Sequence, residues 1–286
     1  MKKTTPRLKQ PKGLSITGIV SLAILVLIIL GAIFAPYITK YDPMYQDETC
    51  MYHTPSWQHL FGTDRFGRDI FCRVLYGSRV SLLMGMLSVG IAGIVGLIIG
   101  VSAGFYGGFL DTAVMRLMDA ISVIPYILVV VLVAAANGFK ARGSTIAIGI
   151  SLIPDFAIWS RALVLNLYGK GFLEAERAFG IKKAVILFRH VLPNIISQYI
   201  MKFTNAFSEA VLAVTALGYL GYAVQPPSPE WGNMLAEGYN SILGGRWWLT
   251  IFPGLCILVT VVCVNLLGND LSRIINGHTN RQGGKG

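Results

Sequence analysis

Residues 80–103 read VSLLMGMLSVGIAGIVGLIIGVSA, an apolar stretch without a single charged side chain. An α-helix needs about 20 apolar residues to cross the hydrocarbon core of a bilayer, so this stretch is long enough to span a membrane. Small residues recur at every fourth position, at Ala92, Gly96, Gly100 and Gly104. Because that spacing puts them on one helix face, they allow another helix to approach closely in lipid. The stretch therefore predicts a membrane-spanning helix with a close neighbour.

Five other apolar stretches of similar length lie on either side of this one. They cover 14–34, 117–136, 144–167, 195–217 and 247–267. Of the 286 residues, 54% are hydrophobic and 13% are charged, and the mean hydropathy is +0.61. This composition is typical of a membrane protein and points away from the soluble classes. We therefore predict an all-α integral membrane protein with about six transmembrane helices and no separate soluble domain.

The 24 Lys and Arg residues flank the apolar stretches and do not form one basic surface. Although the net charge is +10, this distribution favours a role in membrane orientation over nucleic-acid binding. With six crossings both termini share a side, and sixteen of the cations fall on that side against eight on the other. Since cations concentrate in cytoplasmic segments, we predict a multi-pass membrane protein with both termini in the cytoplasm.

These positions divide the chain into successive parts. They are a basic cytoplasmic segment at 1–13, a first transmembrane helix at 14–34, an extracytoplasmic loop at 35–79, a five-helix core at 80–268 with a cytoplasmic loop at 170–194, and a cytoplasmic tail at 269–286. The run at 14–34 follows several cations, as in a signal peptide, but it is too long and lacks a small-residue cleavage site. We interpret it as a retained helix.

The extracytoplasmic loop ends in an amphipathic pattern. Phe66, Ile70 and Val74 fall on one helical face, whereas Arg68 and Asp69 face away, as does Arg65. This pattern predicts a helix that lies at the membrane surface. Cys50 and Cys72 fall in the same loop, and a disulfide between them remains open from the sequence.

The cytoplasmic loop at 170–194 carries a second amphipathic pattern. Its apolar positions Phe172, Ala175 and Phe179 recur at helical spacing, with Glu174 and Arg177 off that face. Gly180 is suited to end a helix in the left-handed conformation. We predict a short helix that projects into the cytoplasm and offers a docking site for a soluble partner.

The order of residues in this loop resembles a known family. Glu174 and Ala175, then Gly180, then the run from His190 to Pro193 resemble the EAA loop of permease subunits in bacterial ATP-binding-cassette (ABC) importers. Stretches at 59–68, 73–77, 104–108, 116–125 and 225–234 resemble the dipeptide, oligopeptide and nickel branch of that family. One departure is Glu176, where the triplet ordinarily has alanine. An extra carboxylate there affects which ATPase the loop matches, but we expect docking to persist.

The resemblance implies a type I ABC permease fold with a cytoplasmic coupling helix, in a bacterial inner membrane. It implies a sister permease in a heterodimer, two ATPase subunits that hold ATP and Mg, and an extracytoplasmic solute-binding protein. The residues expected to couple to the ATPase are Phe172, Glu174, Ala175, Arg177, Gly180, His190 and Pro193. The implied cargo is a dipeptide or oligopeptide, with nickel or a metal chelate as the alternative.

Ionisable residues within the apolar stretches are further candidates, because each costs roughly 3 kcal/mol in lipid unless it faces a cavity or a partner. Arg116 and Asp119 are three residues apart and can form an ion pair along one helix. Asp155 follows Pro154, where a broken helix could line a pathway, although an interhelical hydrogen bond explains it equally well. Glu209 has the same two interpretations.

Other chemistry finds little support in the sequence. Residues 138–145 have the glycine spacing of a phosphate loop but place Ser144 where the lysine belongs. The four histidines are scattered without zinc spacing, and no nucleophile motif occurs. We therefore expect a non-catalytic subunit without a metal or cofactor of its own. The alternatives of another class are a secondary transporter or channel that works without an ATPase, and an intramembrane enzyme.

Overall fold

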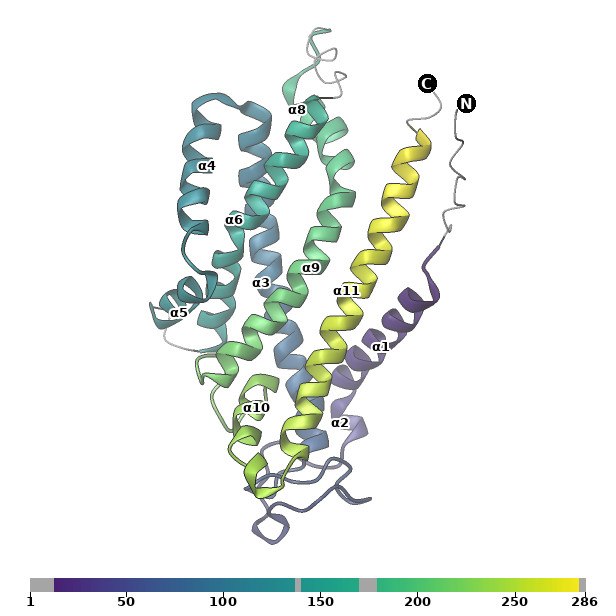
Figure 1. The fold of residues 1–286 in the computed structure, drawn as a ribbon, viewed down its shortest axis with the longest axis vertical. Helices are drawn as coiled ribbons and strands as arrows, with labels where there is room; N and C mark the ends of the chain where they lie inside the picture. The colour runs from purple at the N-terminus through teal and green to yellow at the C-terminus, as the bar shows by residue number, and fades with distance from the viewer. Residues whose placement is uncertain (1–12, 137–139, 170–178, 283–286) are drawn as a thin grey trace, which may run out of the picture.

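The structure, a computed structural model, describes the backbone of residues 13–136, 140–169 and 179–282, and side chains in these ranges up to residue 274. Within them the fold is all-α as predicted, and pairing of the strand type is limited to an isolated antiparallel bridge between Thr63 and Asp69. Long helices run lengthwise beside one another, and an irregular segment with short helices closes one end (Figure 1). We name that end, which contains residues 39–69 and α10, the loop end.

The long helices are α1 (Ile16–Ile33), α3 (Ile70–Tyr106), α6 (Ala141–Tyr168), α9 (Leu192–Tyr219) and α11 (Trp248–Gln282). The shorter helices are α2 (Ala35–Ile38), α4 (Gly108–Ser122), α5 (Tyr126–Ala136), α8 (Lys183–Val185) and α10 (Trp231–Tyr239). A π-helical segment (Ile186–Val191) joins α8 to α9, and single 3-10 turns occur at Glu48–Cys50 and Ile242–Gly244.

The number of membrane crossings agrees with the prediction. The described residues contain five helices that are long and apolar enough to cross a bilayer, and a sixth span arises if α4 and α5 are counted together. These two helices meet at 92°, so the predicted apolar stretch at 117–136 is broken in its middle and does not form one straight helix. The break falls just before Pro125, which lacks an N–H and disfavours helical geometry in the residue before it.

The core is built on the close packing of α3 against α6. A Cβ atom added at Gly96 would overlap Phe156, and one added at Gly100 would overlap the carbonyl oxygen of Ala157. Phe156 and Ala157 are fully buried. The small-residue face predicted from the sequence is therefore confirmed, because only glycine at these positions lets the two backbones approach so closely.

The predicted interfacial helix near residue 70 is not a separate element. Residues from Ile70 onward are the first turns of α3, and Asp69 caps that helix by accepting a hydrogen bond from the backbone N–H of Cys72 (2.7 Å). Arg68 and Asp69 are 1% and 5% exposed, so they do not form the polar face of a helix lying at the membrane surface. Arg68 pairs with Asp64 of the loop and Glu237 of α10, and Asp69 pairs with His59, contacts that a helical pattern does not reveal.

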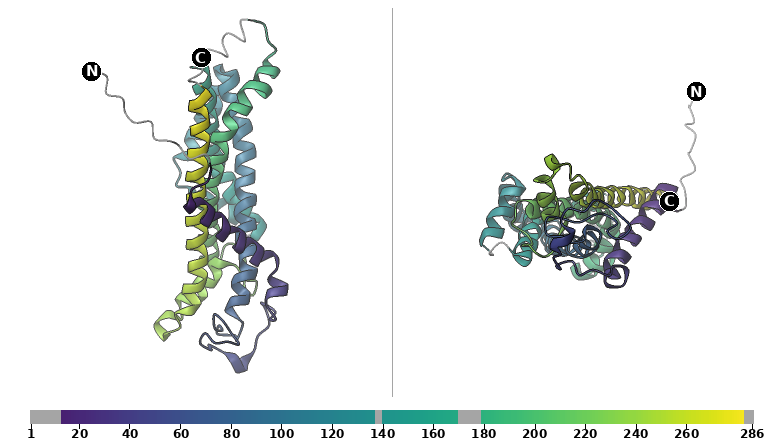
Figure 2. Two further views of the ribbon diagram at one scale, coloured as in Figure 1. Left: turned by 90° about the vertical axis from the view of Figure 1, so that its right-hand side faces the viewer. Right: turned by 90° about the horizontal axis from the view of Figure 1, so that it is seen from below.

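Helix α1 lies obliquely across α3 and α11, as the turned view in Figure 2 shows. Near its start, the backbone N–H and the hydroxyl of Ser15 both donate to the carboxylate of Asp270 on α11. Asp270 is buried and also pairs with Arg273. This contact ties the first helix to the last one.

The structure also decides two smaller questions. Cys50 and Cys72 are both free, and the buried thiol of Cys72 donates to the carbonyl oxygen of Tyr41 (3.1 Å), so the disulfide is not formed. The glycine-spaced segment at 138–145 is helical from Ala141, and Ser144 donates to the carbonyl oxygen of Tyr222 (2.6 Å). Residues 137–139 lie outside the described ranges.

Candidate functional site

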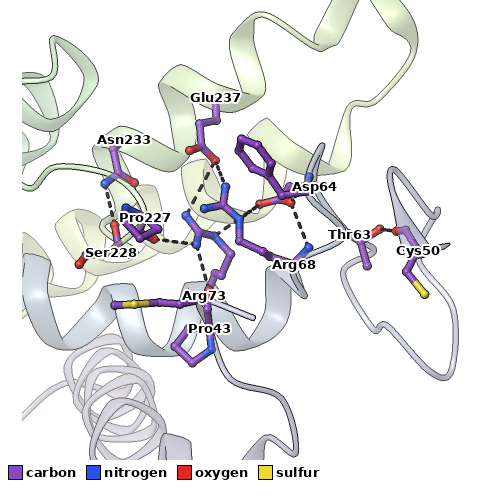
Figure 3. A network of polar contacts seen from close by, with 12 residues as sticks. Pro43, Cys50, Thr63, Asp64, Arg68, Arg73, Pro227, Ser228, Asn233 and Glu237 are labelled. Carbon is purple, nitrogen blue, oxygen red and sulfur yellow. Dashed lines mark hydrogen bonds and ion pairs between the residues drawn. The ribbon is translucent and has the colours of Figure 1, made fainter. Parts of the chain in front are cut away.

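Four charged side chains form a buried cluster at the loop end, which we name the arginine cluster (Figure 3). It consists of Asp64, Arg68, Arg73 and Glu237. Arg68 donates from Nε to Asp64 (2.6 Å) and from Nη2 to Glu237 (2.9 Å). Arg73 lies 3.7 Å from Asp64 and 3.8 Å from Glu237, close enough for ion pairing. The two arginines are 1% and 0% exposed, so their charges depend on these partners.

The cluster joins segments that are distant in the sequence. Nη1 of Arg73 donates to the carbonyl oxygens of Pro43 and Pro227, each at 3.0 Å. Glu237 belongs to α10, whereas Asp64 belongs to the loop before α3. The long external loop, the start of α3 and the proline-containing segment before α10 are therefore held as one unit.

A second buried carboxylate fixes the start of α10. Glu230 is 0% exposed and accepts hydrogen bonds from Ser81 Oγ of α3 (2.9 Å) and from the backbone N–H groups of Gly232 (2.8 Å) and Asn233 (3.0 Å). Burial raises the pKa of Glu230 above its ordinary value. A Cβ atom at Gly218 of α9 would overlap this carboxylate. Glu230 thus links α3, α9 and α10.

Sequence reasoning missed both of these groups as sites. The available signal was the concentration of charge between residues 64 and 73 in a chain with few charges, together with the spacing of four between Asp64 and Arg68. The partner Glu237 lies 169 residues from Arg68, and no local pattern connects the two.

Among the candidates within membrane helices, Asp155 of α6 forms an ion pair with Lys202 of α9. The Asp155 side chain is 53% exposed, whereas that of Lys202 is 17% exposed. The contact is interhelical, which is one of the two interpretations that the sequence left open. Because the carboxylate also faces outward, a role in lining a pathway stays a prediction.

The predicted ion pair between Arg116 and Asp119 is not formed, and both residues are exposed on α4. The salt bridge that links α4 to α6 instead joins Asp111 to Arg161, whose Nε and Nη2 donate at 2.5 and 2.7 Å. Asp111 faces α6, where a bidentate contact with Arg161 is available, and Asp119 lies within electrostatic reach of the same arginine.

Glu209 is exposed on α9, within electrostatic reach of Tyr126 on α5. Together with Asp155 and Asp119 it gives α4, α6 and α9 exposed charges within otherwise apolar helices. Since a charge is costly in lipid, such positions are expected to face water or another subunit.

The predicted coupling loop is described only in part. Phe172, Glu174, Ala175 and Arg177 lie outside the described residues, so their roles stay predictions. Gly180 has φ of +73°, the left-handed conformation predicted for it. His190 lies in the π-helical segment, and Pro193 lies in the first turn of α9. Residues Lys183–Tyr219 together meet the criterion for one membrane span, so the described end of the loop continues directly into α9.

Comparisons with known proteins give consistent matches. A model of the family described as "Binding-protein-dependent transport system inner membrane component" matches residues 96–276. A model of the "N-terminal TM domain of oligopeptide transport permease C" matches residues 17–55. Both the helical core and the first helix are therefore similar to known transport proteins.

Individual relatives cover most of the chain. The chain is 38% identical to the di/tripeptide transport system permease protein DppC of Pseudomonas aeruginosa, over 87% of this chain and 84% of the relative. It is 36% identical to the probable D,D-dipeptide permease DdpC of Escherichia coli (93% and 88%), and 38% identical to the glutathione permease GsiD of E. coli (86% and 81%). In the inward-facing methionine ABC transporter MetNI, a chain of 18% identity matches with a TM-score of 0.56, over 71% of this chain and 95% of that one.

Proposed function

The chain belongs to the family of binding-protein-dependent transport system inner membrane components, and from this premise we propose that it forms half of the translocation pathway of a bacterial importer for short peptides. Its fold is that of an ABC importer permease of type I. The observation that carries the proposal is the identity of 36–38% with permeases named for di- and tripeptides, D,D-dipeptides and glutathione, over nearly the whole chain. These relatives favour a peptide over the alternative cargo, nickel or a metal chelate.

The energy source in this proposal is outside the chain. Two ATPase subunits would hold ATP and Mg, and a solute-binding protein would deliver the peptide on the opposite face. A secondary transporter or channel would work without such partners, so the family membership argues against that alternative. The distribution of cations supports a cytoplasmic position for both termini and for the loop at 170–194.

The coupling step that we propose begins in that loop and ends in α9. Because residues Lys183–Tyr219 form one continuous helical span, a displacement of the loop by the ATPases would move α9 as a lever. Helix α9 carries Lys202 and Glu209, and Lys202 contacts Asp155 of α6. Closure of the ATPases would thus shift charged groups that we assign to the pathway, where a sister permease completes it.

The proposal is tested with the complete transporter in proteoliposomes, by measuring uptake of a labelled dipeptide and ATP hydrolysis together. We expect a Glu174→Lys variant to insert and to bind its partners, but to lose uptake at least tenfold, because reversed charge at the coupling helix prevents force transfer. A Glu176→Lys variant is the matched control, because Glu176 stands where the family ordinarily has alanine, and it should retain most uptake.

Unchanged uptake in the Glu174→Lys variant would contradict the coupling assignment. Transport by the chain reconstituted alone would contradict the ABC mechanism as a whole and favour a secondary transporter. Uptake of nickel in place of the dipeptide would leave the mechanism intact and replace the cargo.

A further inference from the structure

An apolar crevice of about 550 Å³ opens between α1 and the helices α3, α9 and α11. Its volume lies within the range of ligand pockets, about 300–1,000 Å³. Its walls include Ile29 and Ile33 of α1, Leu83 and Met86 of α3, Phe207 of α9 and Leu267 of α11. Among the residues that line it, Arg79 of α3 is the charged one. All four helices are long and apolar enough to cross a membrane, so the crevice lies in the membrane-spanning part of the molecule.

The cation lies at one end of the crevice, where the apolar part of α3 begins. The uncharged stretch of α3 starts directly after Arg79, and α1 ends at Ile33 beside it. Met86 lies seven residues further along α3, or about 10 Å towards the middle of the membrane. The crevice therefore has a charged end at the membrane boundary nearest the loop end and an apolar end directed into the bilayer.

The guanidinium of Arg79 is held in a fixed position by protein groups. Its Nε donates to the carbonyl oxygen of Ala32, and its Nη2 donates to that of Ile33 (2.7 Å). The guanidinium carbon lies 4.9 Å from the ring centre of Tyr76. In the described part of the chain no hydrogen bond uses Nη1. The side chain thus caps α1 with one edge and leaves the other edge available to an anion.

We propose that this crevice binds a phospholipid, with the headgroup phosphate on Arg79 and one acyl chain between α1 and α3. Charge complementarity selects this occupant, because a phosphate is the anion that the bilayer places at the level of the membrane boundary, and guanidinium groups bind phosphate through two N–H donors. The acyl chain fills an apolar space that would otherwise leave the facing side chains without contacts. The lipid would join α1 to the core and does not depend on which solute is carried.

The test compares two lipids with identical acyl chains, phosphatidylglycerol and diacylglycerol, which lacks the phosphate. Each is added to the detergent-purified transporter complex that contains the full chain, and the retained lipid is counted by native mass spectrometry. We expect the wild type to retain phosphatidylglycerol about tenfold better than diacylglycerol, since a charge-assisted contact contributes that much. Arg79→Gln should abolish the preference, and Arg79→Lys should keep most of it.

Two matched controls separate this site from general lipid contact. Arg65→Gln removes an exposed cation at the loop end that does not line the crevice and should leave the preference unchanged. Met86→Trp fills the crevice and should reduce the retention of both lipids, whereas Leu87→Trp, on an exposed neighbour that does not line it, should not.

Each other outcome would overturn the proposal. Equal loss of both lipids in Arg79→Gln would mean that Arg79 only holds α1 in place. An unchanged preference in that variant, or the same result for Met86→Trp and Leu87→Trp, would mean that the crevice is not the binding site. Cross-linking of Met86→Cys to the sister permease, with no lipid retained by the wild type, would assign the surface to a protein contact.

Discussion

The arginine cluster at the loop end and the Asp155–Lys202 pair between α6 and α9 show opposite arrangements of charge. Arg68 and Arg73 belong to a part of the chain that begins outside the apolar stretches, yet they are almost fully buried. Asp155 lies in the middle of a membrane helix, yet its side chain is 53% exposed. The chain therefore buries charge where its own segments complete the network, and leaves a partly exposed ion pair on the α6–α9 face, where water or another subunit is expected.

The difference separates scaffold from moving parts. A buried, ion-paired cluster resists change, because removal of one member leaves an uncompensated charge. An exposed interhelical pair can open and close at little cost, since its charges can exchange one partner for another. We assign the loop end to the rigid part of the molecule and the α6–α9 face to the part that responds to ATPase closure.

The largest expected effect comes from breaking the arginine cluster. Arg68→Ala would leave buried Asp64 and partly buried Glu237 beside the single cation of Arg73. We expect a loss of about 3–5 kcal/mol of stability, measured by thermal unfolding in detergent. Arg65→Ala, an exposed neighbour, should change stability by about 0.5 kcal/mol or less. Equal effects of the two substitutions would remove the distinction between a scaffold and a moving part.

An intermediate effect on stability is expected at Glu230, where it can be detected as a dependence of stability on pH. Because its pKa is raised in the folded state, the folded protein binds this proton more tightly than the unfolded one. The tighter binding of this proton stabilises the folded state fully below pH 4.5, the ordinary pKa. This stabilisation is lost as the pH rises through the higher pKa that Glu230 has in the folded protein. Glu230→Gln should remove this part of the pH dependence and cost about 1 kcal/mol through weaker capping of α10. Thermal unfolding of the wild type and the variant between pH 4 and 8 measures this pH dependence. Parallel curves of unfolding temperature against pH for the two proteins would refute the prediction.

The smallest effect on stability is expected for the exposed pair. Lys202→Met should change the unfolding free energy by about 1 kcal/mol or less, because an exposed pair contributes little. Uptake of a labelled dipeptide by the reconstituted transporter should nevertheless fall, since we place Lys202 in the pathway. Normal uptake in this variant would mean that the Asp155–Lys202 pair has only a structural role.

Much of the fold could be predicted from local patterns. The uncharged stretch at 80–103 with its four-residue glycine spacing predicted a spanning helix and a close neighbour, and α3 packs on α6 through those residues. The break between α4 and α5 at 123–125 was harder to predict from the sequence. Pro125 was visible in the sequence, but a proline in a membrane helix produces anything from a slight kink to a break, and neighbouring helices decide which.

The candidate site was predictable only where residues close in the sequence act together. The loop with Glu174 and Gly180 was selected by spacing and by its resemblance to a family, and its coupling role stays a prediction. The sequence by itself determined the apolar lengths, and hence an all-α membrane protein, because the thickness of the bilayer sets a length that can be counted along the chain. Only the tertiary structure decided that Arg68 meets Glu237, that Arg116 and Asp119 stay apart, and that Arg79 lines a lipid-facing crevice. Those outcomes depend on which helices lie beside one another, and hydrophobic periodicity carries no information about that choice.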